Sequence, residues 1–260
     1  EPQGELLGQT RSAESYSAFF LNQYERMGRA AEVALEQLRA GSLPWCRAMA
    51  PAVQATLNRQ DMSRGSALIA LMLAAEPDAD ARAVYSDALS YVFAICTVAA
   101  PLTMVQAILD RQASIVRDAE VTNPTLGRYL HMCRCTLAAF RTAGAWTLVT
   151  ESQRAVELCE AAGDVRFALI VRSSIAEWGW LDLGDLDGVR QRMEALQAPL
   201  EQSQDVILVA LWRHLLARTL CESTAEVDWE RAEQLVRPLL TQGSGGVVYS
   251  AAARGILARV

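Results

Sequence analysis

A few residues in this sequence carry side chains that could bind a metal. His131, Cys133 and Cys135 lie close together. On a helix His131 and Cys135 share one face, but Cys133 points elsewhere, and no second Cys/His pair stands at zinc spacing. Two ligands do not close a structural zinc site. We therefore interpret these residues as buried thiols beside an interfacial histidine, and we expect no metal and no other cofactor.

The residues that could support catalysis lack the local structure that catalysis needs. His214 could belong to a Ser-His-acid triad with Asp205, or to a Cys-His pair. However, no nucleophile lies on a strained strand-to-helix turn, which is where hydrolases place it. The glycine-rich stretch 243–246 would need a strand before it to bind phosphate, and we predict helices on both sides. The sequence therefore predicts a protein that is not an enzyme. An all-helical enzyme that uses His131 is the alternative, and loss of turnover in His131→Ala would favour it.

Composition excludes several classes of function. With 260 residues and 52% hydrophobic residues, the chain can form a large core. Its net charge of −6 argues against sequence-independent nucleic-acid binding, which requires a basic surface. All 24 basic residues are arginine, so a P-loop lysine or a Schiff-base lysine is absent from this chain.

The six cysteines indicate the compartment. They are scattered through predicted helices and mostly have apolar neighbours, as buried thiols do, so we expect a reducing, cytoplasmic environment. Apolar runs are too short for a membrane span, and no signal peptide opens the chain. Because the first residue is Glu1 and not Met, we expect a domain excised from a longer protein.

The helices that would position any site are clearest between residues 163 and 200. The spacing of apolar residues predicts one helix over 164–183 and a second over 186–200. Gly163 and Gly184 can each end a helix in the left-handed conformation, and Asp164 and Asp185 can cap the helix that follows. Such a hairpin cannot bury its own apolar face, so we expect similar hairpins beside it.

Comparable hairpins are predicted along the whole chain. Their first helices begin near residues 5, 44, 79, 123, 164 and 203, which gives six hairpins and a terminal helix. The first helix is predicted over 5–27, with Gly28 as the turn to its partner. No segment alternates with a period of two, so no strands are predicted. We expect an all-α superhelix in one domain, 1–260, built from neighbour-on-neighbour contacts.

The join between the two helices at residues 181–189, LDLGDLDGV, resembles the centre of a tetratricopeptide repeat. Gly28-Arg29-Ala30 and Gly144-Ala145-Trp146 are weaker versions of it. The long period and the missing prolines resemble the enlarged repeats of maltose-regulator-type bacterial signalling ATPases. More narrowly, the first fifty residues are similar to the C-terminal repeat region of large bacterial serine/threonine kinases that carry a fused ATPase segment.

The resemblance implies a right-handed superhelix whose first helices line a groove. Alignment on the glycine between helices carries groove positions onto Asn22, Glu25, Asp87, Ser90, His131, Arg134, Arg141, Ser174, Trp178, Asp182 and Arg213. Among these, His131, Arg134 and Arg141 could bind a carboxylate. Solvated residues on an ordinary amphipathic helix remain the alternative reading of all three.

The expected function is a non-catalytic scaffold within a bacterial signalling protein. It would bind a protein or peptide segment, or upstream domains of the same polypeptide, but neither nucleic acid nor a membrane. The alternative is a sensor domain that holds a small molecule in its groove, which a closed aromatic pocket around Trp178 would favour. A homodimer through exposed end faces is compatible with both.

Overall fold

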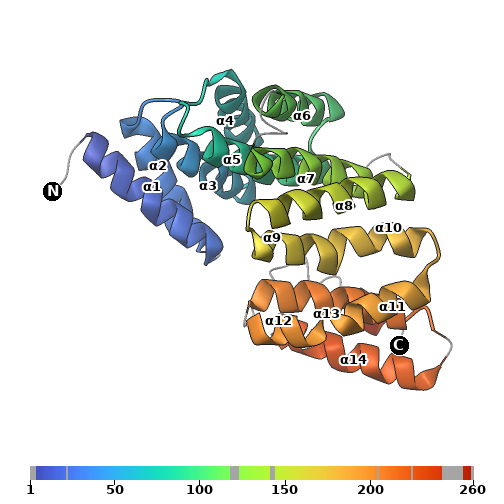
Figure 1. Cartoon of the computed structure of the whole chain (residues 1–260). Helices are drawn as coiled ribbons and strands as arrows, with labels where there is room; N and C mark the ends of the chain where they lie inside the picture. The colour runs from blue at the N-terminus through green and yellow to red at the C-terminus, as the bar shows by residue number, and fades with distance from the viewer. Residues whose placement is uncertain are drawn as a thin grey trace. The chain divides into compact units, whose positions relative to one another are not determined.

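The computed structural model describes residues 4–21, 23–117, 123–140, 144–203, 205–223, 225–241 and 254–258. Every regular element in these residues is a helix, so the prediction of an all-α fold is confirmed (Figure 1). Helices pack against their neighbours in chain order, as in α1·α2, α3·α4, α5·α6 and α13·α14. This is the arrangement expected of a helical repeat.

Contacts divide the chain into two compact units, residues 1–134 and 135–260, and the division falls within α7 (Pro124–Phe140). Each unit has its own core and is described by itself. The expectation of one continuous domain over 1–260 stays a prediction.

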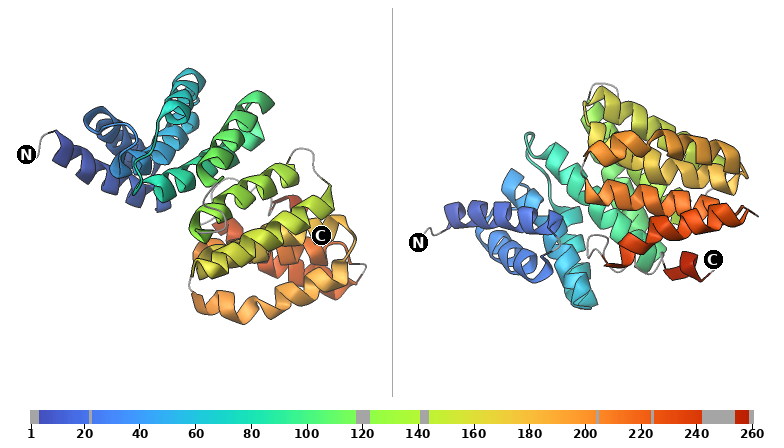
Figure 2. Two further views of the ribbon diagram at one scale, coloured as in Figure 1. Left: turned by 45° about the horizontal axis from the view of Figure 1, so that its top comes forward. Right: turned by 90° about the horizontal axis from the view of Figure 1, so that it is seen from below.

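The first unit consists of three helical hairpins and the first part of α7. Their helices are α1 (Glu5–Phe20), α2 (Tyr24–Gln37), α3 (Leu43–Asn58), α4 (Met62–Ala74), α5 (Arg82–Ala99) and α6 (Leu102–Val116). Both views of Figure 2 show α1 and α2 running side by side. Trp45, Tyr85 and Phe93 are the largest apolar side chains buried here. Removal of their surfaces from water stabilises the unit.

The second unit contains the rest of α7 and the helices that follow it. These are α8 (Ala145–Ala161), α9 (Val165–Ile170), the π-helix η1 (Val171–Ile175), α10 (Ala176–Asp182), α11 (Leu186–Ala195), α12 (Gln197–Ser203), α13 (Val206–Leu220) and α14 (Glu226–Thr241). Its core joins Val189 and Met193 of α11 to Trp212 of α13 and Val236 of α14. The Trp212 indole donates a hydrogen bond to the carbonyl of Met193 at 2.7 Å, which fixes α13 against the end of α11.

The predicted turns at both ends of the 164–183 segment are confirmed. Gly163 and Gly184 have φ angles of +72° and +84°, which side-chain-bearing residues rarely adopt. The carboxylate of Asp164 accepts from the N–H of Phe167 at 3.0 Å, and that of Asp185 accepts from the N–H of Gly188 at 3.2 Å. Both aspartates therefore cap their helices as the sequence predicts.

The prediction that Gly28 ends the first helix is wrong. α1 ends at Phe20, and Gly28 lies inside α2, where α2 crosses α3. A Cβ at Gly28 would lie 2.9 Å from the Cβ of Ala55 and 3.0 Å from Nη1 of Arg59. Glycine is present here because two helices approach closely, not because the chain turns.

Two predicted long helices are interrupted in the structure. The segment 164–183 contains a π-helical turn at 171–175 between α9 and α10. The segment 186–200 divides at Leu196 into α11 and α12. Pro199 follows the second break. Because proline has no N–H to donate to the carbonyl four residues earlier, the backbone hydrogen bonds of one continuous α-helix cannot all form there.

Candidate functional site

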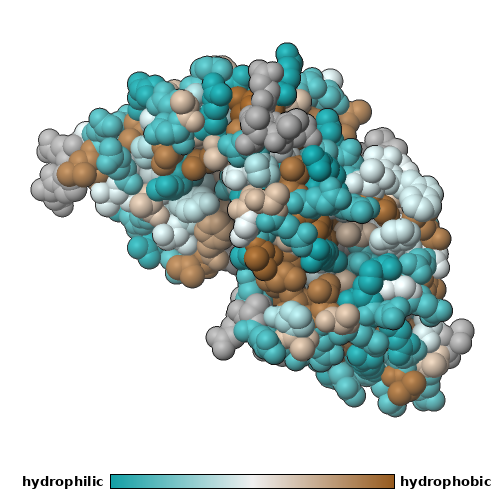
Figure 3. All heavy atoms as spheres, viewed as in Figure 1, coloured by the Kyte–Doolittle hydropathy of each residue, from teal (hydrophilic) through white to brown (hydrophobic). Residues whose placement is uncertain are grey.

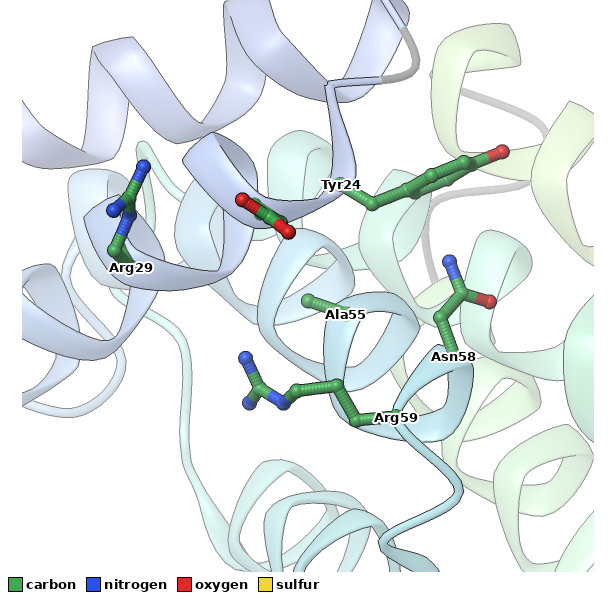
Figure 4. Close-up of a pocket in the computed structure, with 6 residues that line it drawn as sticks. Tyr24, Arg29, Ala55, Asn58 and Arg59 are labelled. Carbon is green, nitrogen blue, oxygen red and sulfur yellow. The ribbon is translucent and has the colours of Figure 1, made fainter.

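A pocket in the first unit lies between α2 and α3. It has a volume of about 370 Å³ and is lined by Tyr24, Glu25, Arg29, Ala55, Asn58 and Arg59. Figure 4 shows the guanidinium groups of Arg29 and Arg59 on one side of the pocket, and Tyr24 and Asn58 on the other. The pocket is open to solvent at Tyr24, whose side chain is 44% exposed.

Helix packing positions the pocket's walls. Because α2 passes close to α3 at Gly28 and Ala55, the next residue of α2, Arg29, and the last turn of α3 flank the same hollow. Arg59 follows α3 directly as its C-cap, and its backbone N–H donates to the carbonyl of Ala55 at 3.2 Å. Its side chain is held by Glu32 of α2, which accepts from Nη2 at 2.6 Å.

The pocket offers more hydrogen-bond donors than acceptors. Arg29 is exposed and makes no hydrogen bond or ion pair with any described residue. Arg59 uses only Nη2 on Glu32, and Asn58 accepts from Gln54 at 3.1 Å through Oδ1, which leaves its Nδ2 group to donate elsewhere. Guanidinium groups bind carboxylates through paired hydrogen bonds, so this site suits an acidic or carbonyl-rich ligand.

A second hollow shares Arg29 on the side facing α1. It has a volume of about 310 Å³, and Arg11, Glu14 and Arg26 also line it. Glu14 accepts from Arg11 at 2.6 Å and from Arg26 at 2.8 Å, and these hydrogen bonds lower its pKa. Because Glu14 pairs with Arg11 and Arg26, and Glu32 pairs with Arg59, Arg29 is the arginine of the two hollows without an ion pair among the described residues.

Among the predicted groove positions of the first unit, Asp87 is engaged inside the protein. The Tyr16 hydroxyl donates to its carboxylate at 3.3 Å, and the guanidinium of Arg47 lies 5.8 Å from the centre of the Tyr16 ring. Burial and the Asp87 charge raise the pKa of Tyr16 to about 12. Asp87 therefore links α1 to α5, the first helices of the first and third hairpins.

The predicted carboxylate grip of His131, Arg134 and Arg141 stays a prediction. His131 is buried, with only 6% of its surface exposed, whereas Arg134 is partly exposed. Arg141 and Asn22 lie outside the described residues, so their predicted roles stay predictions. Glu25 lines the α2–α3 pocket, although the alignment that chose it placed the turn wrongly at Gly28.

In the second unit, Trp178 is partly buried against the core and stacks edge-on to Phe140, with ring centres 5.8 Å apart. Its indole N–H is buried and has no hydrogen-bond partner among the described residues. Asp182 is exposed at the end of α10, and Arg213 is partly exposed on α13. The structure thus brings Trp178 and Asp182 onto one short helix.

The residues with catalytic or metal-binding side chains are mostly buried. None of the six cysteines is in a disulfide, and all except Cys221 are buried. Burial raises the pKa of Cys46 and Cys135 to about 12, so these thiols stay protonated and unreactive. Within the described residues, no group of three or more His, Cys, Asp or Glu side chains could hold a metal ion.

The molecular surface does not carry a membrane-spanning segment in its described part. None of the helices there combines the length and the apolar character that crossing a bilayer requires. On the face shown in Figure 3, hydrophilic side chains predominate and hydrophobic side chains gather in limited groups between them.

Comparisons with known proteins assign no family. A scan against models of protein families finds no match, and a search of curated proteins finds none either. The candidate site is therefore inferred from the geometry of the pocket alone.

Of the six residues that line the pocket, only Glu25 was a predicted groove position. Arg29, Asn58 and Arg59 have no motif that marks them, because α2 and the end of α3 meet only through tertiary packing. The one local signal was the glycine beside Arg29, which sequence analysis assigned to a turn.

Proposed function

We propose that this chain is a non-catalytic helical-repeat module that binds an acidic segment of a partner protein in the α2–α3 pocket. The observation that carries the proposal is Arg29, an exposed guanidinium without a partner among the described residues, at the mouth of a donor-rich hollow. The pocket's own carboxylate, Glu25, makes no ion pair with Arg29, so a carboxylate from the partner would accept from that guanidinium. Helical walls that are already formed keep the ordering cost of binding low.

The wider setting follows from the resemblance noted in the sequence. Tetratricopeptide-like repeats beside a bacterial signalling kinase or ATPase would use such a pocket to hold another domain or protein. A cytoplasmic location fits the buried, protonated thiols, which a reducing compartment preserves. The partner could equally be an upstream domain of the same polypeptide.

A direct test is selection of peptides from a random 12-residue library on the immobilised chain. We expect the enriched peptides to contain Asp or Glu, and each to bind Arg29→Ala at least 5-fold more weakly, because the loss of a charged hydrogen-bond donor costs about 1 kcal/mol or more. Arg64→Ala is the matched control, since Arg64 is also exposed but lies on α4, outside the pocket. Equal losses in both variants, or no enrichment of acidic peptides, would refute the proposal.

The small-molecule alternative has one observation in its favour. The pocket volume of about 370 Å³ lies within the usual range for ligand sites. The pocket is open to solvent, however, whereas small-molecule sites enclose most of their ligand, and Trp178 packs against Phe140 and the core. Thermal stabilisation by small dicarboxylic acids that is lost in Arg29→Ala, without any peptide selection, would favour this alternative.

A further inference from the structure

Two edge-on pairs of aromatic side chains join α10 to α7 and to α8 in the second unit. Phe140 and Trp178 stack edge-on at 5.8 Å, and Trp146 and Trp180 do the same at 5.8 Å. Phe140 is 51% exposed and Trp146 is 64% exposed. Because Trp178 and Trp180 point about 200° apart on α10, the two pairs are separate, and we call the first pair, Phe140 and Trp178, the aromatic surface. Its exposed ring offers contact area to a partner, and tryptophan is enriched at binding hot spots.

Gly179 explains why the aromatic surface forms. A Cβ at Gly179 would lie 2.8 Å from Cγ2 of Val149 and 3.1 Å from the carbonyl oxygen of Ala145. α10 therefore packs against the first turns of α8 almost backbone to backbone. The flanking residues, Trp178 and Trp180, pass α8 on different sides, and each meets one exposed aromatic ring.

The charges beside the aromatic surface favour a cation. Asp182 lies one helical turn after Trp178, so the two side chains share a face of α10. It is exposed and has no ion pair with any described residue. One such contact between a cation and an indole is already present in this unit, where the guanidinium of Arg192 lies 5.2 Å from the centre of the Trp180 ring. Cations are attracted to the electron-rich face of an indole.

We propose that the aromatic surface and Asp182 bind an arginine side chain in an extended segment of a partner protein. The planar guanidinium would stack on the exposed Phe140 ring while its N–H groups pair with the Asp182 carboxylate. Arginine fits better than lysine because its flat group can stack and donate at once. This site lies in the second unit and does not rest on the pocket proposed for acidic segments in the first.

The test uses a defined probe, the peptide acetyl-Gly-Arg-Gly-Arg-Gly-amide, and the same peptide with citrulline in place of both arginines. Citrulline has nearly the same shape but no charge. Indole N–H signals of the ¹⁵N-labelled chain, assigned by single Trp→Phe variants, report binding residue by residue. We expect the arginine peptide to shift the signal of Trp178 in a saturable way and to leave that of Trp146 unchanged, and the citrulline peptide to leave both unchanged.

Two variants decide between a specific site and general attraction to an acidic protein. Asp182→Asn should weaken arginine-peptide binding about 5-fold, the size expected for one exposed ion pair. Asp187→Asn is the control, because Asp187 is exposed on the neighbouring helix α11 and removes the same charge. Equal effects of the two variants, or equal shifts with both peptides, would overturn the proposal. Arg29→Ala should leave this binding unchanged, which separates it from the proposed function.

Discussion

The guanidinium of Arg192 on α11 holds the buried carboxylate of Glu177 on α10, with Nε lying 3.0 Å from Oε1 and 2.9 Å from Oε2. The same side chain donates to Asp185, the cap of α11, at 3.2 Å, and lies over Trp180. Burial raises the pKa of Glu177 even with this partner present. One arginine therefore satisfies a costly buried charge and joins both helices of the hairpin to their turn.

Arg192→Met should lower the free energy of unfolding by about 2 kcal/mol, because it leaves Glu177 buried without its partner. We expect less than the loss for a fully buried pair, since the Arg192 side chain is 40% exposed. Urea unfolding followed by circular dichroism measures the change. Arg172→Met is the control, because Arg172 pairs with Glu160 at the surface and should cost under about 1 kcal/mol. Equal costs would contradict this role for Glu177.

Gly184→Ala should destabilise the protein by about 1 kcal/mol, because alanine is strained at the φ angle of +84° found there. Open space surrounds this position, so the backbone is the whole cause of the cost. The comparison is Gly255→Ala, also in open space but without a positive φ, which should be neutral or slightly stabilising. A neutral result for Gly184→Ala in thermal melts would show that the turn can adopt another conformation.

Gly28→Val should destabilise the first unit by about 1–3 kcal/mol through overpacking against Ala55. It should also displace Arg59, whose Nη1 would lie 3.0 Å from the new Cβ. Melting curves test the first effect, and binding of selected acidic peptides tests the second. Gly255→Val provides the comparison because nothing surrounds that position. Unchanged stability would mean that α2 and α3 are not in close contact.

His214 gives a pH dependence of known sign. Its pKa is lowered by burial and by the nearby Arg218, so the folded state resists protonation that the unfolded state accepts. Below the unfolded pKa of about 6.5, the unfolded state binds more protons and stability falls as the pH falls. We expect His214→Gln to lose less stability than the original chain between pH 7.5 and pH 5.5 in urea titrations. Parallel losses would show that His214 is accessible to protons when folded.

The sequence predicted turns best where two local signals coincide. At Gly163-Asp164 and Gly184-Asp185, a residue suited to a positive φ stands beside a residue suited to cap a helix, and both features depend on the chain within a few residues. Gly28 carried only the first signal. A glycine serves a turn and a helix crossing equally well, and only the position of α3 decides between them.

The two interruptions of predicted helices and the α2–α3 pocket were missed for different reasons. The π-helical turn at 171–175 leaves no mark in apolar spacing, because one extra residue in a turn changes the periodicity too little to detect. The break before α12 did have a signal, Pro199, which the regular spacing of Leu196 and Leu200 outweighed in the prediction. Of the predicted site residues, Trp178 and Asp182 lie together, whereas the α2–α3 pocket could be found only from the packed helices.

The order of helix contacts bears on how the chain folds. The helices that pack most closely are neighbours or near neighbours along the chain, as in α1·α2, α2·α3, α8·α10 and α13·α14. Few long loops must close before such contacts form, so the entropic barrier to folding is low and nucleation can begin at any well-formed hairpin. We therefore expect rapid refolding in which structure spreads from one hairpin to the next.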